Sequence, residues 1–185
     1  MIVLTGPSAS GKTETAKYLM EKFGLKKVIT CTTRSPRKGE VNDVDYHFLT
    51  RDQFAEGKAA DEFLETAEYN GNLYGTKYAD LGPDKVVCVE PIGAHSYRKA
   101  LGEKMFCVYL DASEETRLAR MIELRKDGIE AAQERIRRDR EVFSDDINGA
   151  KGVANVILVT DGWSVEREAL EVYEAYQTWK AQHSL

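Results

Sequence analysis

The sequence has few of the residues that build disulfide or zinc sites. Its 185 residues include three cysteines and three histidines, and both kinds are far apart along the chain. Each of Cys31, Cys88 and Cys107 stands in an apolar, strand-like setting. We therefore expect three reduced thiols in the core, and neither a disulfide framework nor a cysteine-based zinc site. The scattered histidines do not form a ligand set at metal-binding spacing either.

An excess of basic residues and long apolar runs are also missing. The chain has 26 lysines and arginines against 31 aspartates and glutamates, a net charge of −5, whereas a protein that neutralises nucleic-acid phosphates normally carries a basic excess. No apolar run approaches the ~18 residues of a membrane span, and the first residues lack the pattern of a secretory signal. We expect a cytoplasmic protein that contacts neither nucleic acid nor a membrane. Its length suits one domain.

Apolar runs and helical patterns alternate along the chain. The runs cover residues 2–4, 28–29, 86–89, 106–110 and 156–159. They are continuous rather than alternating, which is typical of strands buried on both faces of a parallel sheet. Apolar residues recur at helical spacing in a first helix, with Ala16, Leu19, Met20 and Phe23, and in a last helix, with Val165, Ala169, Val172, Tyr176 and Trp179. This order predicts an α/β fold in which helices flank a parallel sheet.

A first segment, residues 32–80, interrupts this order. It contains polar turns, a short strand at 46–48, a helix opened by the capping box Thr50-x-x-Gln53, and an aromatic stretch. We interpret it as a small inserted lobe.

A second segment, residues 117–144, is the most basic part of an acidic chain. The turn Asp127-Gly128 divides its arginine-rich helical pattern, which predicts a helix–turn–helix hairpin that acts as a lid. The chain would then be a single domain, 1–185, whose core comprises residues 1–31, 81–116 and 145–185.

A glycine-rich loop joins the first apolar run to the first helical pattern. Its residues fit the pattern G-x-x-x-x-G-K-[ST]: Gly6, Pro7, Ser8, Ala9, Ser10, Gly11, Lys12 and Thr13. Such a loop turns consecutive backbone N–H groups inward at a helix N-terminus, where they can bind a polyphosphate. Lys12 would reach the β- and γ-phosphates, and the Thr13 hydroxyl would ligate Mg²⁺. We assign these eight residues to ATP binding and leave the role of the next residue, Glu14, unknown; the alternative is a glycine-rich turn without a ligand.

An acidic residue for the magnesium site is expected at the end of a neighbouring buried strand. Glu90 follows the run 86–89 and occupies such a place, and Asp111 after the run 106–110 is its competitor. Asp111 looks more like a residue at the start of a helix. The alternative for Glu90 is a solvated carboxylate at a strand end.

Two arginines, Arg34 and Arg37, flank Pro36 in a segment that suits a phosphate dianion, because planar guanidinium groups bind phosphate in two-pronged contacts. At this point the sequence resembles the guanylate kinase family. The matching stretches are residues 6–13, 32–40, 45–48, 63–65 and 71–76. The run T-T-R-x-P-R-x-G-E at 32–40 is the most specific, since a P-loop alone indicates an NTPase. The resemblance implies a P-loop NTPase-type sheet with an inserted monophosphate-binding lobe and a helical lid.

The resemblance also implies roles for residues of the lobe. Four side chains would hold the phosphate of the incoming monophosphate: Arg34, Arg37, Tyr46 and Tyr74. Glu65 and Thr76 would face its base, and Thr30 falls where the family often has a serine that helps there. The alternative is that the arginines are surface charges and the tyrosines half-buried strand residues.

The lid arginines are assigned by the same resemblance. Arg120 aligns with a family arginine, and Arg135 fits the second lid helix, with Arg138 and Arg125 as neighbours that a small shift would substitute. The catalytic set is then Lys12, Arg34, Arg120, Arg135 and Arg138. The alternative is a solvated basic helix face.

The implied activity is ATP + GMP (or dGMP) → ADP + GDP (or dGDP), with Mg²⁺. The chain has Cys88-Val89-Glu90 where the family commonly has D-x-D, and this favours a kinase for another phosphorylated acceptor, such as a different deoxynucleotide or a sugar phosphate, as the alternative. A guanylate-kinase-like module that binds proteins is a further alternative. The intact Lys12 and Thr13 argue against it. The expected partners are nucleotides. The sequence does not indicate which oligomeric state the protein has.

Overall fold

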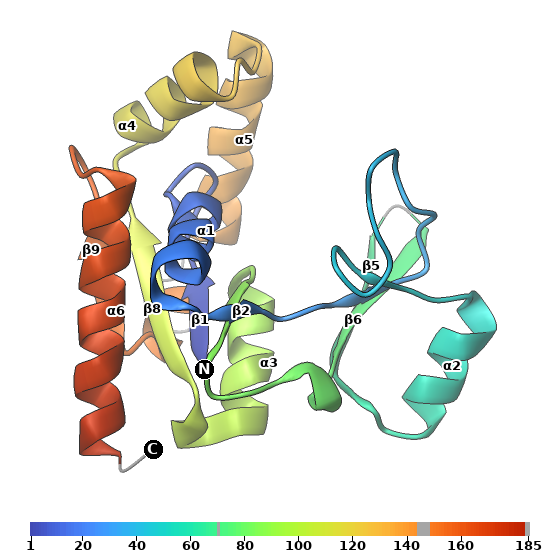
Figure 1. The fold of residues 1–185 in the computed structure, drawn as a ribbon. Helices are drawn as coiled ribbons and strands as arrows, with labels where there is room; N and C mark the ends of the chain where they lie inside the picture. Colours follow the sequence, from blue (N-terminus) through green and yellow to red (C-terminus); the bar gives the residue numbers. More distant parts are fainter. Residues whose placement is uncertain (70, 144–148, 184–185) are drawn as a thin grey trace.

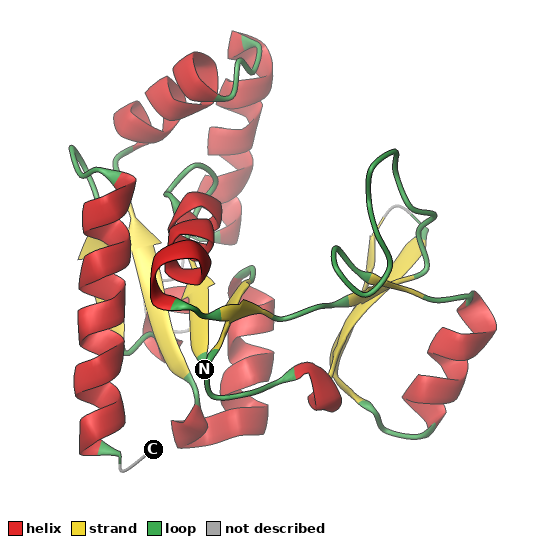
Figure 2. Ribbon diagram, viewed as in Figure 1, coloured by secondary structure: helices red, strands yellow, loops and turns green. Residues whose placement is uncertain are grey.

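A parallel sheet forms the centre of the computed structural model, which describes residues 1–69, 71–143 and 149–183. Within these residues the sheet has five strands: β1 (Ile2–Thr5), β2 (Lys26–Lys27), β7 (Lys85–Cys88), β8 (Phe106–Asp111) and β9 (Val156–Val159). Their order is β2-β7-β1-β8-β9, and every pair is parallel. Helices cover both faces of the sheet (Figures 1 and 2). The predicted α/β fold with a flanked parallel sheet is confirmed.

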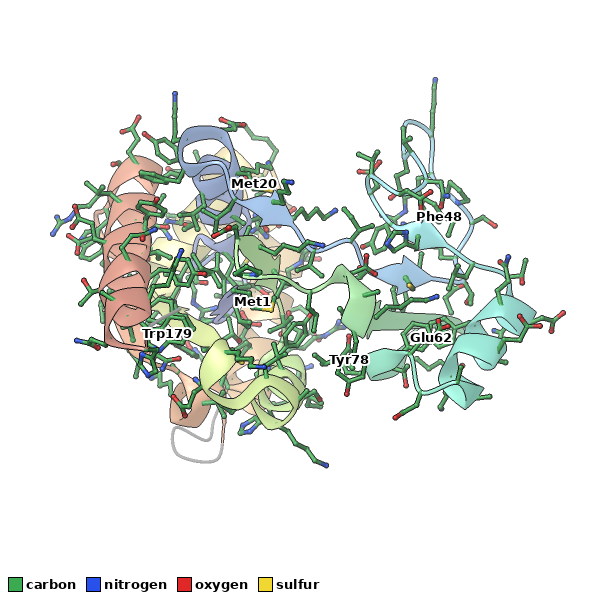
Figure 3. All side chains as sticks on the ribbon, turned by 60° about the horizontal axis from the view of Figure 1, so that its bottom comes forward. Met1, Met20, Phe48, Glu62, Tyr78 and Trp179 are labelled. Carbon is green, nitrogen blue, oxygen red and sulfur yellow. The ribbon has the colours of Figure 1, made fainter. Side chains whose placement is uncertain are left out.

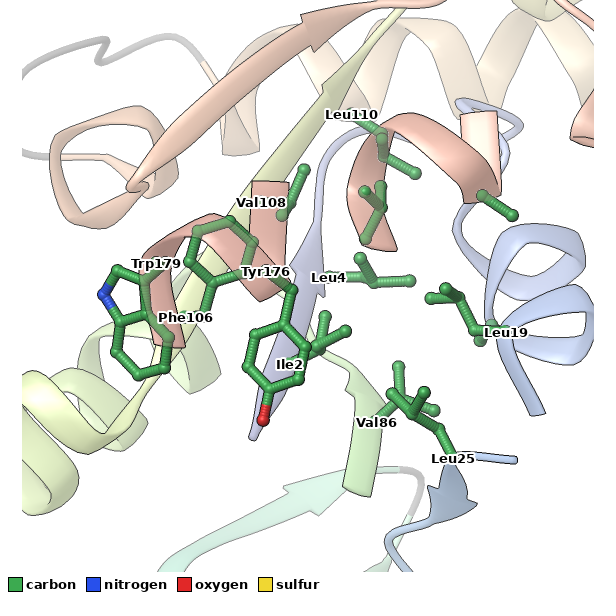
Figure 4. Packing of buried hydrophobic residues seen from close by; sticks show 13 residues of the cluster. Ile2, Leu4, Leu19, Leu25, Val86, Phe106, Val108, Leu110, Tyr176 and Trp179 are labelled. Atoms are coloured by element: carbon green, nitrogen blue, oxygen red, sulfur yellow. The ribbon is translucent and has the colours of Figure 1, made fainter. Parts of the chain in front are cut away.

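The two faces of β1 pack against different helices. Ile2 and Leu4 belong to a cluster with α1 (Lys12–Phe23) and α6 (Val165–Gln182), in which Tyr176 and Trp179 lie beside Phe106 (Figure 4). Val3 belongs to a second cluster with α3 (Pro91–Leu101). Burial on both faces explains why β1 and β8 read as continuous apolar runs. The expectation was wrong for the run 156–159, because β9 lies at the edge of the sheet and exposes Ile157 and Val159. In the predicted stripe of α6, Ala169, Val172, Tyr176 and Trp179 are buried, whereas Val165 is exposed.

The lid is a pair of helical segments at one end of the core. After α4 (Glu114–Ala119) the chain forms a π-helical turn, η3 (Arg120–Leu124), and reverses before α5 (Ile129–Val142). Ser113 caps α4 by accepting the Thr116 N–H at 3.2 Å. The predicted boundary between lid and core, between residues 144 and 145, lies outside the described residues.

The inserted lobe has its own mixed sheet, of order β4-β3-β6-β5. In it β3 and β4 are parallel, and the other neighbouring strands are antiparallel. Its elements are β3 (Cys31–Thr32), β4 (His47–Phe48), α2 (Arg51–Ala59), β5 (Phe63–Tyr69) and β6 (Asn72–Lys77). The predicted capping box of Thr50 and Gln53 opens α2. The lobe stands beside the core (Figure 1), with Phe48 and Glu62 on the side of the molecule opposite Trp179 (Figure 3).

Short helical turns complete the chain: η1 (Tyr78–Asp80), which leads from the lobe back to the core, η2 (Gly102–Lys104) and η4 (Ala150–Val153). In the described part of the chain, no helix combines the length and hydrophobicity that crossing a membrane requires.

Three further local predictions were wrong. The second core strand is Lys26–Lys27 instead of residues 28–29, although the Val28 N–H still bonds to the Val86 carbonyl at 3.0 Å. Cys88 is exposed, because it is the last residue of β7 and lines the open cavity beside Lys12, whereas Cys31 and Cys107 are buried. Asp111 ends β8 and does not begin a helix.

Candidate active site

The glycine-rich loop lies between β1 and α1, and its backbone requires its glycines. Gly6 and Gly11 have φ values of 140° and 113°, in a region that side chains rarely adopt. A Cβ on Gly6 would lie 2.1 Å from the Leu110 carbonyl oxygen. A Cβ on Gly11 would lie 2.2 Å from a carboxylate oxygen of Glu168. Gly11 precedes α1 without a side-chain cap, so the first N–H groups of α1 can face an anion.

Lys12 folds back over the loop that it follows. Its Nζ donates to the carbonyl oxygens of Gly6 at 2.6 Å and Pro7 at 2.9 Å. Burial lowers the pKa of Lys12, and the charge of Glu90 opposes this shift. The ammonium group is therefore held over the loop by carbonyls that an anionic ligand can replace.

A cavity of about 300 Å³ opens between the loop and the end of β7. It is lined by Ser8, Ala9, Lys12, Thr13, Cys88, Val89, Glu90 and Arg125. Burial raises the pKa of Glu90, and Lys12 opposes the shift. Asp111, the competing acid, instead pairs with Lys151 at 3.2 Å and does not line this cavity.

The donor set in this cavity fits Mg²⁺. Magnesium takes hard oxygen ligands, usually one or two carboxylates together with waters and substrate phosphates. The Thr13 hydroxyl and the Glu90 carboxylate line the same cavity and are donors of this kind. Among the described residues no three His, Cys, Asp or Glu side chains cluster as a metal site.

The first lobe arginine is held by the acid of its own motif. Arg34 donates from Nη1 and Nη2 to the two carboxylate oxygens of Glu40, at 2.9 and 2.8 Å, and the Arg37 N–H donates to Glu40 at 2.6 Å. These hydrogen bonds, that of Arg34 first, lower the pKa of Glu40 to about 2. Glu40 thus folds the loop 34–40 so that both arginines belong to one turn.

Aromatic rings border the Arg34 guanidinium. It lies 5.5 Å from the ring centre of Tyr46 and 5.9 Å from that of Phe48. The Tyr46 and Tyr74 rings meet edge to face at 6.5 Å. Hydrogen bonding to Glu40, with a smaller contribution from Tyr74, raises the pKa of Arg34. The structure therefore brings Arg34, Tyr46 and Tyr74 together, with Arg37 on the same turn.

Glu65 and Thr76 face each other across neighbouring strands. They are paired in the β5–β6 register, so their side chains share one face of the lobe sheet, and the Thr76 hydroxyl donates to Glu65 Oε1 at 2.8 Å. Burial raises the pKa of Glu65, and the hydrogen bonds from Thr76 oppose this shift. Thr30 is half-buried just before β3, and its carbonyl accepts the His47 N–H at 2.9 Å.

The lid contacts the P-loop through a carboxylate that the sequence did not indicate. Asp139 of α5 accepts the Ser8 N–H at 2.9 Å and the Ser8 hydroxyl at 3.0 Å. Arg117 of α4 donates to the same carboxylate at 2.6 Å, and both members of this pair are buried. A second pair lies nearby, where Arg120 donates to Glu168 at 3.0 Å and to the Ala9 carbonyl at 3.3 Å.

The remaining lid arginines lie in different places. Arg125 lines the cavity beside Lys12. It also lines a second cavity of about 560 Å³, which lies between the P-loop, the lid and the start of α6. Glu14 and Trp163 line this second cavity as well. Arg135 is exposed and lies 3.6 Å from Asp127. Arg138 is exposed and donates to Glu134 at 2.9 Å. In this conformation Arg125 is the lid arginine that lines the cavity beside Lys12.

Sequence patterns gave no sign of Asp139, Arg117 or Glu168. In a helix rich in charge, Asp139 and Arg117 read as members of a solvated face. Glu168 reads as an acid of the first turn of α6, where it suits the helix dipole. The contact of Asp139 with Ser8 joins residues 131 positions apart, a relation that local spacing does not carry.

Comparisons with known proteins agree with this geometry. A family model described as guanylate kinase matches residues 1–161. A protein named guanylate kinase from Clostridium perfringens is 36% identical over 152 residues, which cover 78% of this chain and 69% of the relative. Another from Trichormus variabilis is 34% identical over 179 residues, covering 93% of this chain and 87% of the relative.

Solved structures show a related fold. The crystal structure of guanylate kinase from Anaplasma phagocytophilum aligns with a TM-score of 0.66 and 21% identity, covering 96% of this chain and 84% of that one. Shikimate kinase from Acinetobacter baumannii, solved in complex with shikimate, aligns with a TM-score of 0.54 and 16% identity, covering 96% and 92%. At such identities the likeness concerns the fold.

The buried pair Arg117–Asp139 generates a prediction about stability. Removing one partner of a buried ion pair leaves the other charge uncompensated, so we expect Asp139→Ala to lower the free energy of unfolding by about 3–5 kcal/mol. Glu134→Ala on the same helix removes an exposed pair and should cost less than about 1 kcal/mol. Urea unfolding of the parent and both variants gives the comparison. Equal losses for the two variants would show that Asp139 does not hold the lid on the P-loop.

Proposed function

The chain belongs to the guanylate kinase family, and from this we propose that it transfers the γ-phosphate of ATP to GMP or dGMP, giving ADP and GDP or dGDP. The proposal includes the division of the chain into a core, a monophosphate-binding lobe and a lid. The cytoplasmic location expected from the sequence stays a prediction.

The observation that carries the choice of acceptor is the pair Glu65 and Thr76. A guanine base presents N1–H and N2–H donors next to the O6 acceptor. A carboxylate can accept the two donors in charge-assisted bonds while a hydroxyl donates to O6. The two groups lie 2.8 Å apart on one face of the lobe sheet, which suits neighbouring atoms on the edge of one base.

The donor half works by backbone geometry and one ammonium group. The inward N–H groups of the P-loop and the N-terminus of α1 would bind the ATP phosphates. These phosphates would replace the Gly6 and Pro7 carbonyls as partners of Lys12, which then lies where charge shifts during transfer. The cavity bordered by Trp163, Arg125 and Glu14 has room for the donor nucleoside.

The acceptor half presents a nucleophile that is already charged. A phosphate monoester has a second pKa of about 6, so the acceptor phosphate is mostly a dianion at neutral pH, and no general base is needed. Four side chains would orient the acceptor phosphate: Arg34, Arg37, Tyr46 and Tyr74. The phosphate would compete with Glu40 for Arg34, whose planar fork serves either anion.

Thr13 and Glu90 are the residues that would hold Mg²⁺ between the two halves. When bound, the ion neutralises charge on the β- and γ-phosphates. Lys12 contributes to the same neutralisation from the protein side.

Arginines of the lid complete the site in this proposal. Arg125 lines the cavity already, and Arg120, Arg135 and Arg138 are the further candidates from the lid helices. Closure of lobe and lid over the P-loop would exclude water, which otherwise competes with the acceptor for the γ-phosphate.

Substitution of Lys12 tests the proposed role of the P-loop in binding and transferring the ATP γ-phosphate. We expect Lys12→Ala to lower kcat by roughly 10²–10³-fold, because removing one preorganised cation or donor at the transferring group typically has this effect. The measurement is a coupled assay of ADP release with Mg-ATP and GMP, together with a thermal unfolding curve. Lys17→Ala on the exposed side of α1 is the matched control and should retain parental kcat. Near-parental kcat for Lys12→Ala would remove the P-loop assignment.

The lobe arginines test the acceptor half. Arg34→Ala and Arg37→Ala should each raise KM for GMP by roughly 10–100-fold, since a hydrogen bond to a charged group contributes about 1.5–3 kcal/mol. The affinity of the free enzyme for ATP, measured by calorimetry, should change little. Arg51→Ala, on α2 of the same lobe, is the control for general damage to the lobe. Equal losses of ATP and GMP affinity would contradict separate phosphate sites.

The preferred base of the acceptor nucleotide tests the proposed function itself. We expect kcat/KM to be highest for GMP and dGMP in a panel that also contains AMP, CMP, UMP and sugar phosphates, because adenine N1 has a lone pair that would face the Glu65 carboxylate. Glu65→Gln should lower kcat/KM for GMP by at least about tenfold and leave that for AMP nearly unchanged. A different preferred acceptor would favour the alternative kinase that Cys88 suggests, and no transfer to any acceptor would favour a binding module.

A further inference from the structure

A buried tyrosine of the core contacts the base-facing pair of the lobe. The Tyr97 hydroxyl, on α3, donates to Thr76 Oγ1 at 3.1 Å, and Thr76 in turn donates to Glu65 Oε1 at 2.8 Å. Tyr97 is fully buried and Thr76 is 1% exposed. The three groups form a chain of hydrogen bonds that starts in the core and ends at a half-buried carboxylate.

The ring of Tyr97 is fixed by the core. It packs with Val3, Val87, Ala94, Met105 and Cys107, in the cluster on the α3 side of the sheet. Leu64 of β5 packs against the same cluster, so this is where the lobe meets the core. A side chain held so closely has few alternative positions for its hydroxyl. Thr76 therefore receives its hydrogen bond from a fixed direction.

The direction of the hydrogens in this chain follows from its ends. Glu65, when ionised, can only accept, so the hydrogen between Thr76 and Glu65 belongs to Thr76. Thr76 has one hydrogen, so the hydrogen between Tyr97 and Thr76 belongs to Tyr97. Burial raises the pKa of Tyr97, which keeps the phenol protonated and able to donate. Tyr97 thus occupies one of the two lone pairs of Thr76. The one hydrogen of Thr76, which Glu65 accepts here, would turn to O6 when a base binds and the Glu65 carboxylate accepts the N–H groups of that base.

We propose that Tyr97 is a positioning residue that makes Thr76 a hydrogen-bond donor toward the acceptor base, and that it thereby favours 6-oxopurine over 6-aminopurine monophosphates. A hydroxyl that accepts one hydrogen bond donates a stronger one. O6 of guanine or hypoxanthine accepts that hydrogen, whereas the N6 amino group of adenine is itself a donor and would find one lone pair of Thr76 instead of two, because Tyr97 occupies the other. The inference rests on the proposed function, because it assumes that Glu65 and Thr76 face the base.

The test removes the hydroxyl and keeps the ring. In Tyr97→Phe we expect KM for GMP and IMP to rise together by about five- to tenfold, the usual effect of one hydrogen bond, while kcat changes less than about twofold. The GMP/IMP ratio should stay constant, since both bases carry O6 and N1–H. The inhibition constant of AMP against GMP should stay the same or fall, and KM for ATP should not change.

Two further variants separate positioning from general stability. Tyr176→Phe removes a buried tyrosine hydroxyl that donates to the Pro83 carbonyl in the other core cluster, and it should leave KM for GMP and the AMP inhibition constant at parental values. In a Thr76→Val background, Tyr97→Phe should have no further effect on KM for GMP, because the residue acts through Thr76.

The possible outcomes distinguish a failure of the proposed function from a failure of the role proposed for Tyr97. If the parent protein does not phosphorylate GMP, the proposed function fails. If the parent does so but Tyr97→Phe leaves KM for GMP unchanged, or raises KM for GMP and the AMP inhibition constant equally, the role of Tyr97 is overturned. An undiminished effect of Tyr97→Phe in the Thr76→Val background would overturn it as well.

Discussion

One buried carboxylate ties the donor side of the molecule together. Glu168 of α6 is 1% exposed, and it accepts hydrogen bonds from Thr15 of α1 at 3.0 Å and from Arg120 of the lid at 3.0 Å. It also lies against Gly11, where a Cβ would collide with it. Burial raises its pKa and the charge of Arg120 opposes the shift. A charge buried at this depth is tolerated because it is paired and hydrogen-bonded, so in this conformation Glu168 holds the P-loop, α1, the lid and α6 in their mutual positions.

The same constraint explains why the lid is built on ion pairs. Arg120–Glu168 and Arg117–Asp139 each join a lid residue to a group that touches the P-loop. An apolar contact tolerates sliding, whereas a buried, hydrogen-bonded pair is satisfied in one geometry. Asp139 also accepts the N–H and the hydroxyl of Ser8, so it sets the conformation of the loop directly. The cost of this arrangement is that neither partner can be lost without leaving a buried charge.

What could be predicted from the sequence is what local spacing carries. The P-loop, the capping box at Thr50 and the parallel sheet follow from consecutive residues. The acceptor residues rest on the family resemblance of residues 32–40, 45–48, 63–65 and 71–76, and their roles stay a prediction. What was missed depends on contacts between distant elements. Asp139 belongs to a charged helix face, and Tyr97 to an apolar stripe that is satisfied by core packing alone. Cys88 was expected in the core because an apolar run does not show which of its residues lines a cavity at the end of the strand.

The two halves of the site are therefore specified by different means. On the donor side, backbone geometry and buried ion pairs leave little freedom, and a change at Gly11 or Glu168 disturbs several elements at once. On the acceptor side, the side chains proposed to face the base lie on a small sheet, and the lobe meets the core near Leu64 and Tyr97. Under this assignment, a substitution there would alter which base is accepted while the phosphate-binding loop keeps its shape. Acceptor specificity would then change independently of the transfer chemistry, because the residues proposed to select the base are not the residues that hold the P-loop.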